Sequence, residues 1–241
     1  MTRMRLLVSV RDLDEALLAA EGGVDFIDLK EPREGALGGL PVATIRAVVR
    51  GLRERGIALP ISATIGDVGM DQLDLIEARV EAVGACGVDY VKVGIERSPD
   101  AAEVLDMLAE SRHAVVPVFI ADAGLDVGLI ARACRLGFPA VMADTADKRA
   151  GSIFACVGAT ELQRFVATVR EAGKLAGLAG ALRLPDLPAL RELAPDFAGF
   201  RSAVCGGDRA STLDAQKVRG LAEAARYLAK LNPQSSASFL R

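Results

Sequence analysis

Short apolar runs alternate with helical patterns along the whole chain, and this alternation constrains the fold more than any other feature. It indicates parallel strands that are joined by crossover helices. The strand-like runs cover residues 6–10, 24–29, 59–65, 88–93, 114–120, 138–143, 174–179 and 196–201. Eight repeats of this unit in 241 residues favour a single closed TIM (β/α)₈ barrel, a fold that typically takes about 250 residues.

An open, doubly wound sheet is the alternative arrangement of alternating strands and helices. That fold usually has fewer units and often carries a GxGxxG turn after its first strand. Here the corresponding turn reads SVRDLDE and contains no glycine, so the sequence favours the barrel. We expect residues 1–231 to form one catalytic domain and residues 232–241, NPQSSASFLR, to form a loosely ordered tail.

Capping signals predict where three of the helices begin. Asp12 is predicted to cap the first helix, with Glu15 three residues later in the capping-box position. Ser98 and Pro99 predict a cap and a first-turn proline for the helix after the fourth strand. Asp214 is predicted to cap the last helix.

The composition argues against several kinds of partner. The net charge is −3 and charges of both signs are interspersed, so no basic face for nucleic acid is predicted. No apolar run reaches the ~18 residues of a membrane span. The N-terminus, MTRMRLLVSV, turns into a helical pattern where a secretory signal would stay apolar. We therefore expect a cytoplasmic protein. A homo-oligomer is compatible with the sequence, although no surface patch can be singled out.

Histidine and cysteine are poorly placed for metal or redox chemistry. The cysteines are widely spaced, with no CxxC or Cys/His cluster, so no metal site is predicted. They are Cys86, Cys134, Cys156 and Cys205, and we expect them to be reduced. The only histidine, His113, is predicted at a helix end with a structural or solvated role. Acid–base groups must therefore be mostly Lys, Asp, Glu or Tyr, and no cofactor is indicated.

Lysines at the ends of predicted strands are the main candidates for catalysis. In this class of barrel the active site lies at the carboxyl ends of the strands. Lys92 interrupts the apolar run VDYVKVG, and Lys30 follows Asp28 by two residues, on the same side of its strand. A desolvated lysine can act as a nucleophile, and a nearby aspartate can exchange protons with it. For each lysine the alternative is a side chain that extends to solvent or joins a surface ion pair.

The loop after the sixth strand, TADKRAGSIFACV, is longer than most connections between a strand and a helix. Asp144 lies at its start and Lys148 lies within it. Long loops at this end of a barrel often form lids or substrate clamps, which makes both residues candidates. An ordinary surface excursion is the alternative.

Glycine-rich turns after the seventh and eighth strands predict a phosphate site. Gly180 follows the seventh strand, and Gly206 and Gly207 follow the eighth. Barrels of this class often bind phosphate at these positions through backbone N–H groups. Arg209 can add positive charge, and Asp67, after the third strand, is a further candidate for substrate binding. Glycines needed only for turn geometry are the alternative.

Lysines, aspartates able to move protons and a phosphate site together fit Schiff-base chemistry on a sugar phosphate. The segments VDFIDLKEPREGALG, SATIGD, DYVKVG, MADTADK and CGGDR resemble those of the (5-formylfuran-3-yl)methyl phosphate synthases, in the same order. The resemblance covers nearly the whole chain. These are TIM-barrel enzymes of furan-cofactor (methanofuran or methylofuran) biosynthesis.

This resemblance implies a specific reaction and a role for each candidate. The family condenses two molecules of glyceraldehyde 3-phosphate, with loss of phosphate and water, and needs no cofactor. By similarity Lys30 is the Schiff-base lysine and Asp28 its partner. Lys92, Asp144 and Lys148 are then implied as proton-transfer and positioning groups.

Two other functions remain open from the residues. One is a class I aldolase or an isomerase that acts on another sugar phosphate through the same lysine. The other is a non-catalytic barrel that binds a phosphorylated metabolite. The sequence favours catalysis, because lysines buried in strands are costly to keep without a use.

Overall fold

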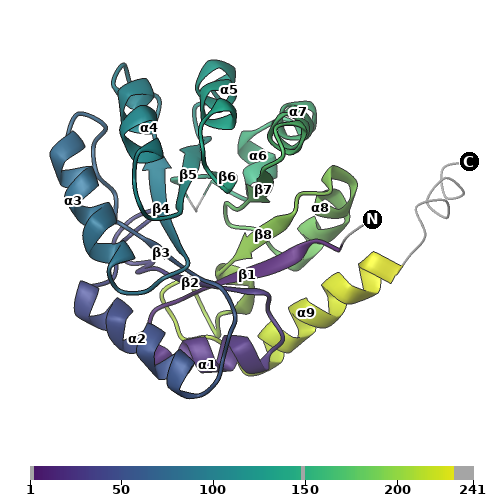
Figure 1. Cartoon of the computed structure of the whole chain (residues 1–241). Coiled ribbons are helices and arrows are strands. Elements are labelled where there is room, and N and C mark those ends of the chain that lie inside the picture. Colours follow the sequence, from purple (N-terminus) through teal and green to yellow (C-terminus); the bar gives the residue numbers. More distant parts are fainter. Residues whose placement is uncertain (1–2, 148–149, 231–241) are drawn as a thin grey trace, which may run out of the picture.

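A computed structural model describes residues 3–147 and 150–230, and its strands form a closed barrel in the order β1 to β8. All neighbouring strands pair in parallel, and β8 pairs with β1 to close the ring. Helices surround the barrel between consecutive strands (Figure 1). The predicted TIM (β/α)₈ barrel is therefore confirmed. The predicted tail, residues 232–241, lies outside the described residues.

The eight predicted strands are all present, with ends that differ by a few residues from those expected. They are β1 (Arg5–Val10), β2 (Phe26–Leu29), β3 (Ile61–Thr64), β4 (Tyr90–Ile95), β5 (Val115–Ile120), β6 (Ala140–Asp144), β7 (Leu175–Leu178) and β8 (Phe197–Phe200). Val24 explains one difference. Its N–H donates to the carbonyl of Ala19 at 3.5 Å, so its backbone still belongs to the end of the preceding helix.

Helices follow the strands in the chain, and two short helices are present that the sequence did not predict. They are α1 (Leu13–Glu21), α2 (Val42–Glu54), α3 (Leu73–Gly84), α4 (Ala101–Ala109), α5 (Val127–Arg135), α6 (Ile153–Cys156), α7 (Ala159–Glu171), α8 (Leu187–Leu193) and α9 (Ala215–Lys230). The sequence predicted neither α6 nor α8. Both are short, and α8 begins in the segment LPDLPAL, where closely spaced prolines obscure the helical pattern. No described helix is both long and apolar enough to cross a membrane.

The predicted caps are confirmed at two of the three helices. Asp12 accepts a hydrogen bond from the N–H of Glu15 at 2.9 Å. The carboxylate of Glu15 accepts from the N–H of Arg11 (2.9 Å), one residue before the capping-box donor. Asp214 accepts from the N–H groups of the second and third residues of α9, Gln216 and Lys217.

The predicted start of α4 is wrong. Ser98 and Pro99 lie in a turn, and the helix begins at Ala101 after Asp100. The hydroxyl of Ser98 accepts from the N–H of Asp100 at 3.2 Å, and its carbonyl accepts from Ala101. Side chains such as serine stabilise turns in this way as readily as helix starts, so the motif alone does not separate the two.

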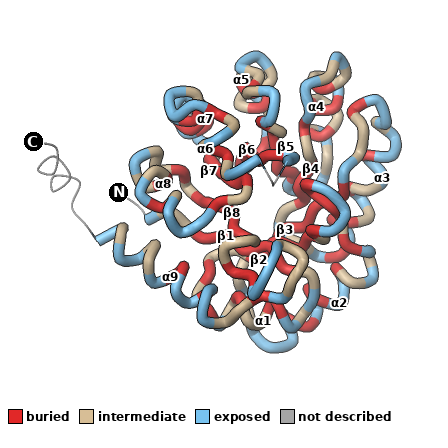
Figure 2. The backbone as a smooth tube through the Cα atoms, turned by 180° about the vertical axis from the view of Figure 1, so that it is seen from behind, coloured by how far each residue is buried: buried red, intermediate tan, exposed pale blue. Residues whose placement is uncertain are grey.

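Two apolar regions build the core. One lies between the strands and the surrounding helices, and in Figure 2 the strands are largely red while the outward sides of the helices are largely pale blue. The other fills the barrel interior with Leu7, Leu37, Val116, Val118, Ala140, Met142, Ala179 and Phe197. The Phe197 ring lies against Gly177, where an added Cβ would be 2.2 Å from it, and 5.8 Å from the Phe26 ring. Apolar side chains thus fill one end of the interior and leave the polar side chains at the carboxyl ends of the strands.

Candidate active site

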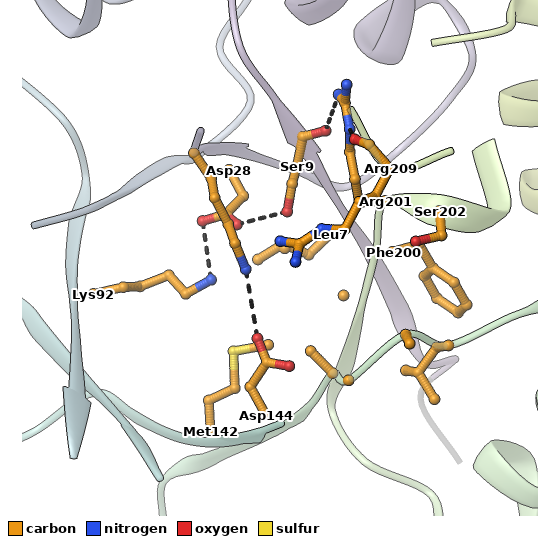
Figure 3. Close-up of a pocket in the computed structure, with 16 residues that line it drawn as sticks. Leu7, Ser9, Asp28, Lys92, Met142, Asp144, Phe200, Arg201, Ser202 and Arg209 are labelled. Carbon is orange, nitrogen blue, oxygen red and sulfur yellow. Dashed lines mark hydrogen bonds and ion pairs between the residues drawn. The ribbon is translucent and has the colours of Figure 1, made fainter. Parts of the chain in front are cut away.

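A pocket opens at the carboxyl ends of the strands, as expected for this fold (Figure 3). Its polar lining residues are Ser9, Asp28, Lys30, Lys92, Asp144, Arg201, Ser202 and Arg209. A second, apolar cavity lies in the barrel interior and also has Lys92 in its lining. Lys92 therefore lies between the polar pocket and the apolar cavity.

Asp28 accepts hydrogen bonds from three side chains. Its Oδ1 accepts from Lys92 Nζ at 3.0 Å and from Ser62 Oγ at 2.6 Å, and its Oδ2 accepts from Ser9 Oγ at 2.9 Å. The three donors are buried, and Asp28 is fully buried. Figure 3 shows Lys92 and Ser9 joined to this carboxylate by dashed lines.

Strand register explains this cluster. Ser9 is paired with Asp28 between β1 and β2, and Asp28 is paired with Ser62 between β2 and β3. The three side chains therefore lie at one level on the interior face of the barrel. Lys92 reaches the same carboxylate from two residues farther along, since its register partner is Thr64, two residues after Ser62.

Lys30 forms the second lysine–aspartate pair of the pocket. Its Nζ lies 3.5 Å from Oδ2 of Asp144, the last residue of β6. Both residues are buried, with 6% and 2% of their surfaces exposed. The pair joins β2 to β6 across the barrel, so two ammonium groups and two carboxylates share one chamber.

The structure brings the four predicted residues together but gives Lys30 and Lys92 their partners in a different order. The resemblance implied Asp28 as the partner of Lys30, whereas the ion pairs join Asp28 to Lys92 and Asp144 to Lys30. A spacing of two residues puts two side chains on one face but separates them by about 6.6 Å along the strand. Long lysine side chains therefore meet acids of other strands. Lys148 lies outside the described residues.

The structure places the predicted phosphate-binding glycines in two different settings: Gly180 lines the pocket, whereas Gly206 and Gly207 do not. Gly180 lines the pocket with φ of 109°, and the next residue, Ala181, also has a positive φ, of 45°. Within the described residues, the N–H groups of residues 180–182 have no hydrogen-bond acceptor. Successive free N–H groups at residues of positive φ form a concave site for an anion. The first half of the prediction thus has suitable geometry.

Gly206 and Gly207 do not line the pocket and are exposed. Their N–H groups donate within their own loop, to the carbonyl of Thr212 and the hydroxyl of Ser211, both at 2.9 Å. Here the turn-geometry alternative describes the glycines better, since those donors are already used.

Arg209 lies in the pocket lining as expected, whereas Asp67 does not. Burial lowers the pKa of the Arg209 guanidinium, and the negative charge of Asp144 opposes this shift. Arg209 Nη2 also donates to the carbonyl of Gly35 at 3.2 Å. Asp67 accepts from the N–H of Leu37 at 3.0 Å, so it supports the loop after β2.

Sequence reasoning missed Ser9, Ser62, Arg201 and Glu15. The two serines stand at interior positions of β1 and β3, and alternation along those strands could have identified them. Arg201 directly follows β8 at the end of the predicted strand. Glu15 was interpreted only as a capping residue, although it forms a buried ion pair with Arg201.

The cysteines and the histidine lie outside this cluster. All four cysteines are free thiols, and burial raises the pKa values of Cys86, Cys134 and Cys205, which disfavours their nucleophilic thiolates. His113 Nε2 lies 3.1 Å from a carboxylate oxygen of Glu81. None of these residues lines the pocket.

Comparisons with known proteins agree with one another. A family model described as 4-HFC-P synthase matches residues 6–222. The (5-formylfuran-3-yl)methyl phosphate synthase of Archaeoglobus fulgidus is 34% identical over 92% of this chain and 99% of its own length. That of Methanosarcina barkeri is 33% identical over 90% of this chain and 97% of its own length. A protein of Methylorubrum extorquens, named provisionally for the same activity, is 39% identical over 93% of this chain and 92% of its own.

Solved structures of similar shape are barrels. Phosphoribosyl anthranilate isomerase from Thermus thermophilus aligns with a TM-score of 0.65 and 16% identity, over 93% of this chain and 100% of its own. A 3-hexulose-6-phosphate synthase aligns with a TM-score of 0.54 and 18% identity, over 90% of this chain and 99% of its own. Identities this low establish a shared fold and no more.

Proposed function

The chain belongs to the (5-formylfuran-3-yl)methyl phosphate synthase family, and on that premise we propose that it condenses two molecules of glyceraldehyde 3-phosphate through a Schiff base on Lys30. The product is (5-formylfuran-3-yl)methyl phosphate, for furan-cofactor biosynthesis. The observation that carries the proposal is the pair of buried lysine–aspartate contacts in one pocket. A buried ion pair often adds little to stability, because removing both charges from water is costly. Ion pairs buried in a pocket are therefore candidates for a functional role.

Lys30 is the nucleophile in this proposal. Its amine adds to a substrate carbonyl and water leaves, which gives an iminium ion that acidifies the adjacent C–H bond. Asp144, 3.5 Å from Lys30 Nζ, accepts that proton and forms the enamine. The enamine carbon then attacks the carbonyl of the second substrate.

Lys92 and Asp28 form the positioning half of the site. The hydroxyl groups of Ser9 and Ser62 hold the Asp28 carboxylate, and Asp28 in turn holds the Lys92 ammonium near the reacting atoms. A fixed ammonium can stabilise the oxyanion that forms at the attacked carbonyl. Lys148, implied by similarity, adds a further proton-transfer group.

Elimination completes the reaction without an external oxidant or reductant. The C–O bond to one phosphate breaks, ring closure and dehydration give the aromatic furan, and water releases the Lys30 amine. Two glyceraldehyde 3-phosphates thus balance one furan phosphate, one free phosphate and two waters. The proposal therefore makes the enzyme a carbon–oxygen lyase acting on phosphates that needs no cofactor. Phosphorylated substrates and products cross membranes poorly, which supports a cytoplasmic location.

The retained phosphate is proposed to sit between residues 180–182 and Arg209. The N–H groups of residues 180–182 offer hydrogen-bond donors, and the guanidinium of Arg209 offers charge in the lining of the same pocket. This combination suits a phosphate monoester dianion better than a carboxylate or a neutral sugar.

Product analysis tests the proposed reaction. Purified protein and glyceraldehyde 3-phosphate alone are expected to release phosphate and to accumulate a conjugated aldehyde that absorbs in the near ultraviolet. Reversible aldol condensation or triose isomerisation without phosphate release would instead identify the aldolase or isomerase alternative.

Borohydride trapping tests the residue. Reduction in the presence of glyceraldehyde 3-phosphate is expected to leave a covalent adduct on the peptide that contains Lys30. Lys30→Ala is expected to lose the adduct and turnover while keeping the fold. Lys174→Ala is a matched control, because that lysine donates to the carbonyls of Leu136 and Phe138 and does not line the pocket. A wild-type protein that binds the substrate without forming an adduct would support the non-catalytic alternative.

A further inference from the structure

Arg201 is a buried arginine for which the proposed reaction has no role; 9% of its surface is exposed. Its guanidinium donates to both carboxylate oxygens of Glu15, at 2.5 and 3.1 Å. It also donates to backbone carbonyls, to Ser9 at 3.0 Å, Arg209 at 3.0 Å and Ser211 at 2.6 Å. One guanidinium therefore ties α1, β1 and the loop after β8 together.

Glu15 is shared between two arginines. Besides Arg201, it pairs with Arg11, whose Nη2 lies 3.1 Å from Oε1. Burial raises the pKa of Glu15, but its hydrogen bonds to Arg201 and Arg11 outweigh this and lower it overall. The carboxylate is thus a charged anchor in a buried position.

The two arginines together hold a short stretch of backbone in the loop after β8. Arg201 donates hydrogen bonds to the carbonyls of Arg209 and Ser211, and Arg11 Nη1 donates one to the carbonyl of Ala210 at 2.9 Å. Three consecutive carbonyls are therefore bound by guanidinium groups that share one carboxylate. A loop segment held in this way has little freedom to shift.

The side chain of Arg209 extends from this fixed backbone into the pocket lining. Its Nη2 contacts the carbonyl of Gly35, in the loop after β2. The residue is thus held at its carbonyl by Arg201 and at its guanidinium by the loop after β2.

We propose that Arg201 and Glu15 are positioning residues that set the place of the Arg209 guanidinium in a subsite for the phosphate of the substrate. The inference rests on the proposed function, because it takes Arg209 as a phosphate ligand. An arginine suits the task, since its rigid fork can meet a carboxylate and carbonyls at once, whereas a lysine offers a single point charge.

Binding of glycerol 3-phosphate tests the proposal without requiring turnover. This probe keeps the phosphate monoester but has no carbonyl, so it forms no Schiff base. Its Kd, measured by calorimetry, is expected to rise about tenfold in Arg209→Ala and by a similar factor in Arg201→Lys and in Glu15→Gln. Each variant is measured at a temperature at which circular dichroism finds it fully folded. If Arg201→Lys does not fold, the isosteric Glu15→Gln carries the test.

A double-mutant cycle separates positioning from general destabilisation. If Arg201 acts through Arg209, Arg201→Lys is expected to change the Kd by less than about twofold in the Arg209→Ala background. Additive effects would overturn the proposal, and so would an unchanged Kd in Arg201→Lys and Glu15→Gln.

Asp89→Asn is the matched control. Asp89 also binds an arginine, Arg53, and a backbone N–H, that of Ile61, but it precedes β4 at the opposite end of the barrel. Its replacement is expected to leave the Kd unchanged even if stability falls, and a comparable rise in Kd would overturn the proposal.

The outcomes also distinguish this inference from the proposed function. Suppose that the wild-type protein binds glycerol 3-phosphate and the double-mutant cycle gives the expected result, but the protein neither releases phosphate from glyceraldehyde 3-phosphate nor forms the adduct. This outcome would refute the proposed reaction and support the positioning of Arg209 by Arg201 and Glu15. Normal turnover with an additive cycle would do the reverse. Failure of the wild-type protein to bind glycerol 3-phosphate would overturn the inference.

Discussion

Asp28 illustrates how a single carboxylate can organise a charged interior. Both of its oxygens are occupied by donors from three different strands, and none of those donors is exposed. Hydrogen bonds to an ionised acceptor are stronger than those between neutral groups. In the proposed reaction this arrangement suits a fixed counter-ion of Lys92, and proton exchange is assigned to Asp144, whose Oδ2 lies 3.5 Å from Lys30 Nζ.

Ser62→Ala tests that assignment. The change removes the 2.6 Å hydrogen bond to Asp28 and leaves the other two donors in place. A bond to a charged group contributes about 1.5–3 kcal/mol, so we expect kcat to fall by roughly tenfold or more if the bond is needed in the transition state. Steady-state kinetics with glyceraldehyde 3-phosphate measures the effect.

Ser111→Ala is the control for this prediction. The Ser111 hydroxyl accepts from the N–H of His113 at 3.2 Å, in the connection between α4 and β5, and does not line the pocket. We expect its kcat to match that of the wild type. Equal activity of the two variants would show that the Ser62 hydroxyl does not support catalysis.

The sequence predicts single residues of the site better than their contacts. Lys30, Asp28, Lys92 and Asp144 could be identified because each stands at the interior end of a strand. The pairing of Lys30 with Asp144 could not, since it depends on how strands on opposite sides of the barrel are staggered. Spacing along one strand carries no information about that stagger.

At the scale of elements, caps fix where helices start. Asp126 precedes α5 and accepts from the N–H of Leu129 at 3.0 Å. Asp126→Ala leaves that donor without its acceptor, and we expect the free energy of unfolding to fall by about 1 kcal/mol. Urea denaturation measures this change as a shift in midpoint at constant slope.

Gln72→Ala provides the comparison for Asp126→Ala. Gln72 occupies the equivalent position before α3, but its side chain makes no capping hydrogen bond. We expect a change within about 0.5 kcal/mol for this exposed site. If both variants lost the same stability, the cap at α5 would not be the cause.

Elements were predictable where their pattern is long and regular. The eight strands and the long helices follow from apolar spacing, because each buries one face in the core. The four-residue α6 and the proline-containing α8 have too few turns to produce such a pattern. At α4 the same serine signal fits a turn or a cap, and only the surrounding packing selects between them.

At the scale of the whole molecule, the Glu15–Arg201 pair couples acidity to stability. The folded pKa of Glu15 lies below its ordinary value near 4.5, so at acid pH the unfolded chain binds more protons at this group. The free energy of unfolding therefore falls as pH decreases through 4.5 and the contribution is lost below the folded pKa.

Glu15→Gln is expected to remove this part of the acid sensitivity. The variant should be less stable than the wild type at about pH 7, because Arg201 and Arg11 lose their counter-ion, and the difference should narrow toward about pH 3. Urea denaturation across this range measures both curves. Parallel curves would contradict the assignment of the shift to Glu15.

The Glu15–Arg201 pair also joins residues 186 positions apart in the chain, which has a consequence for synthesis on the ribosome. A nascent chain that ends after β4 already contains Lys30 and Lys92, but it lacks the acid of β6 and the arginine that follows β8. Lys30 then has no Asp144 with which to form its ion pair. The complete set of ion pairs forms only when the last strand has emerged and closed the barrel. We therefore expect an incomplete translation product to have no catalytic activity.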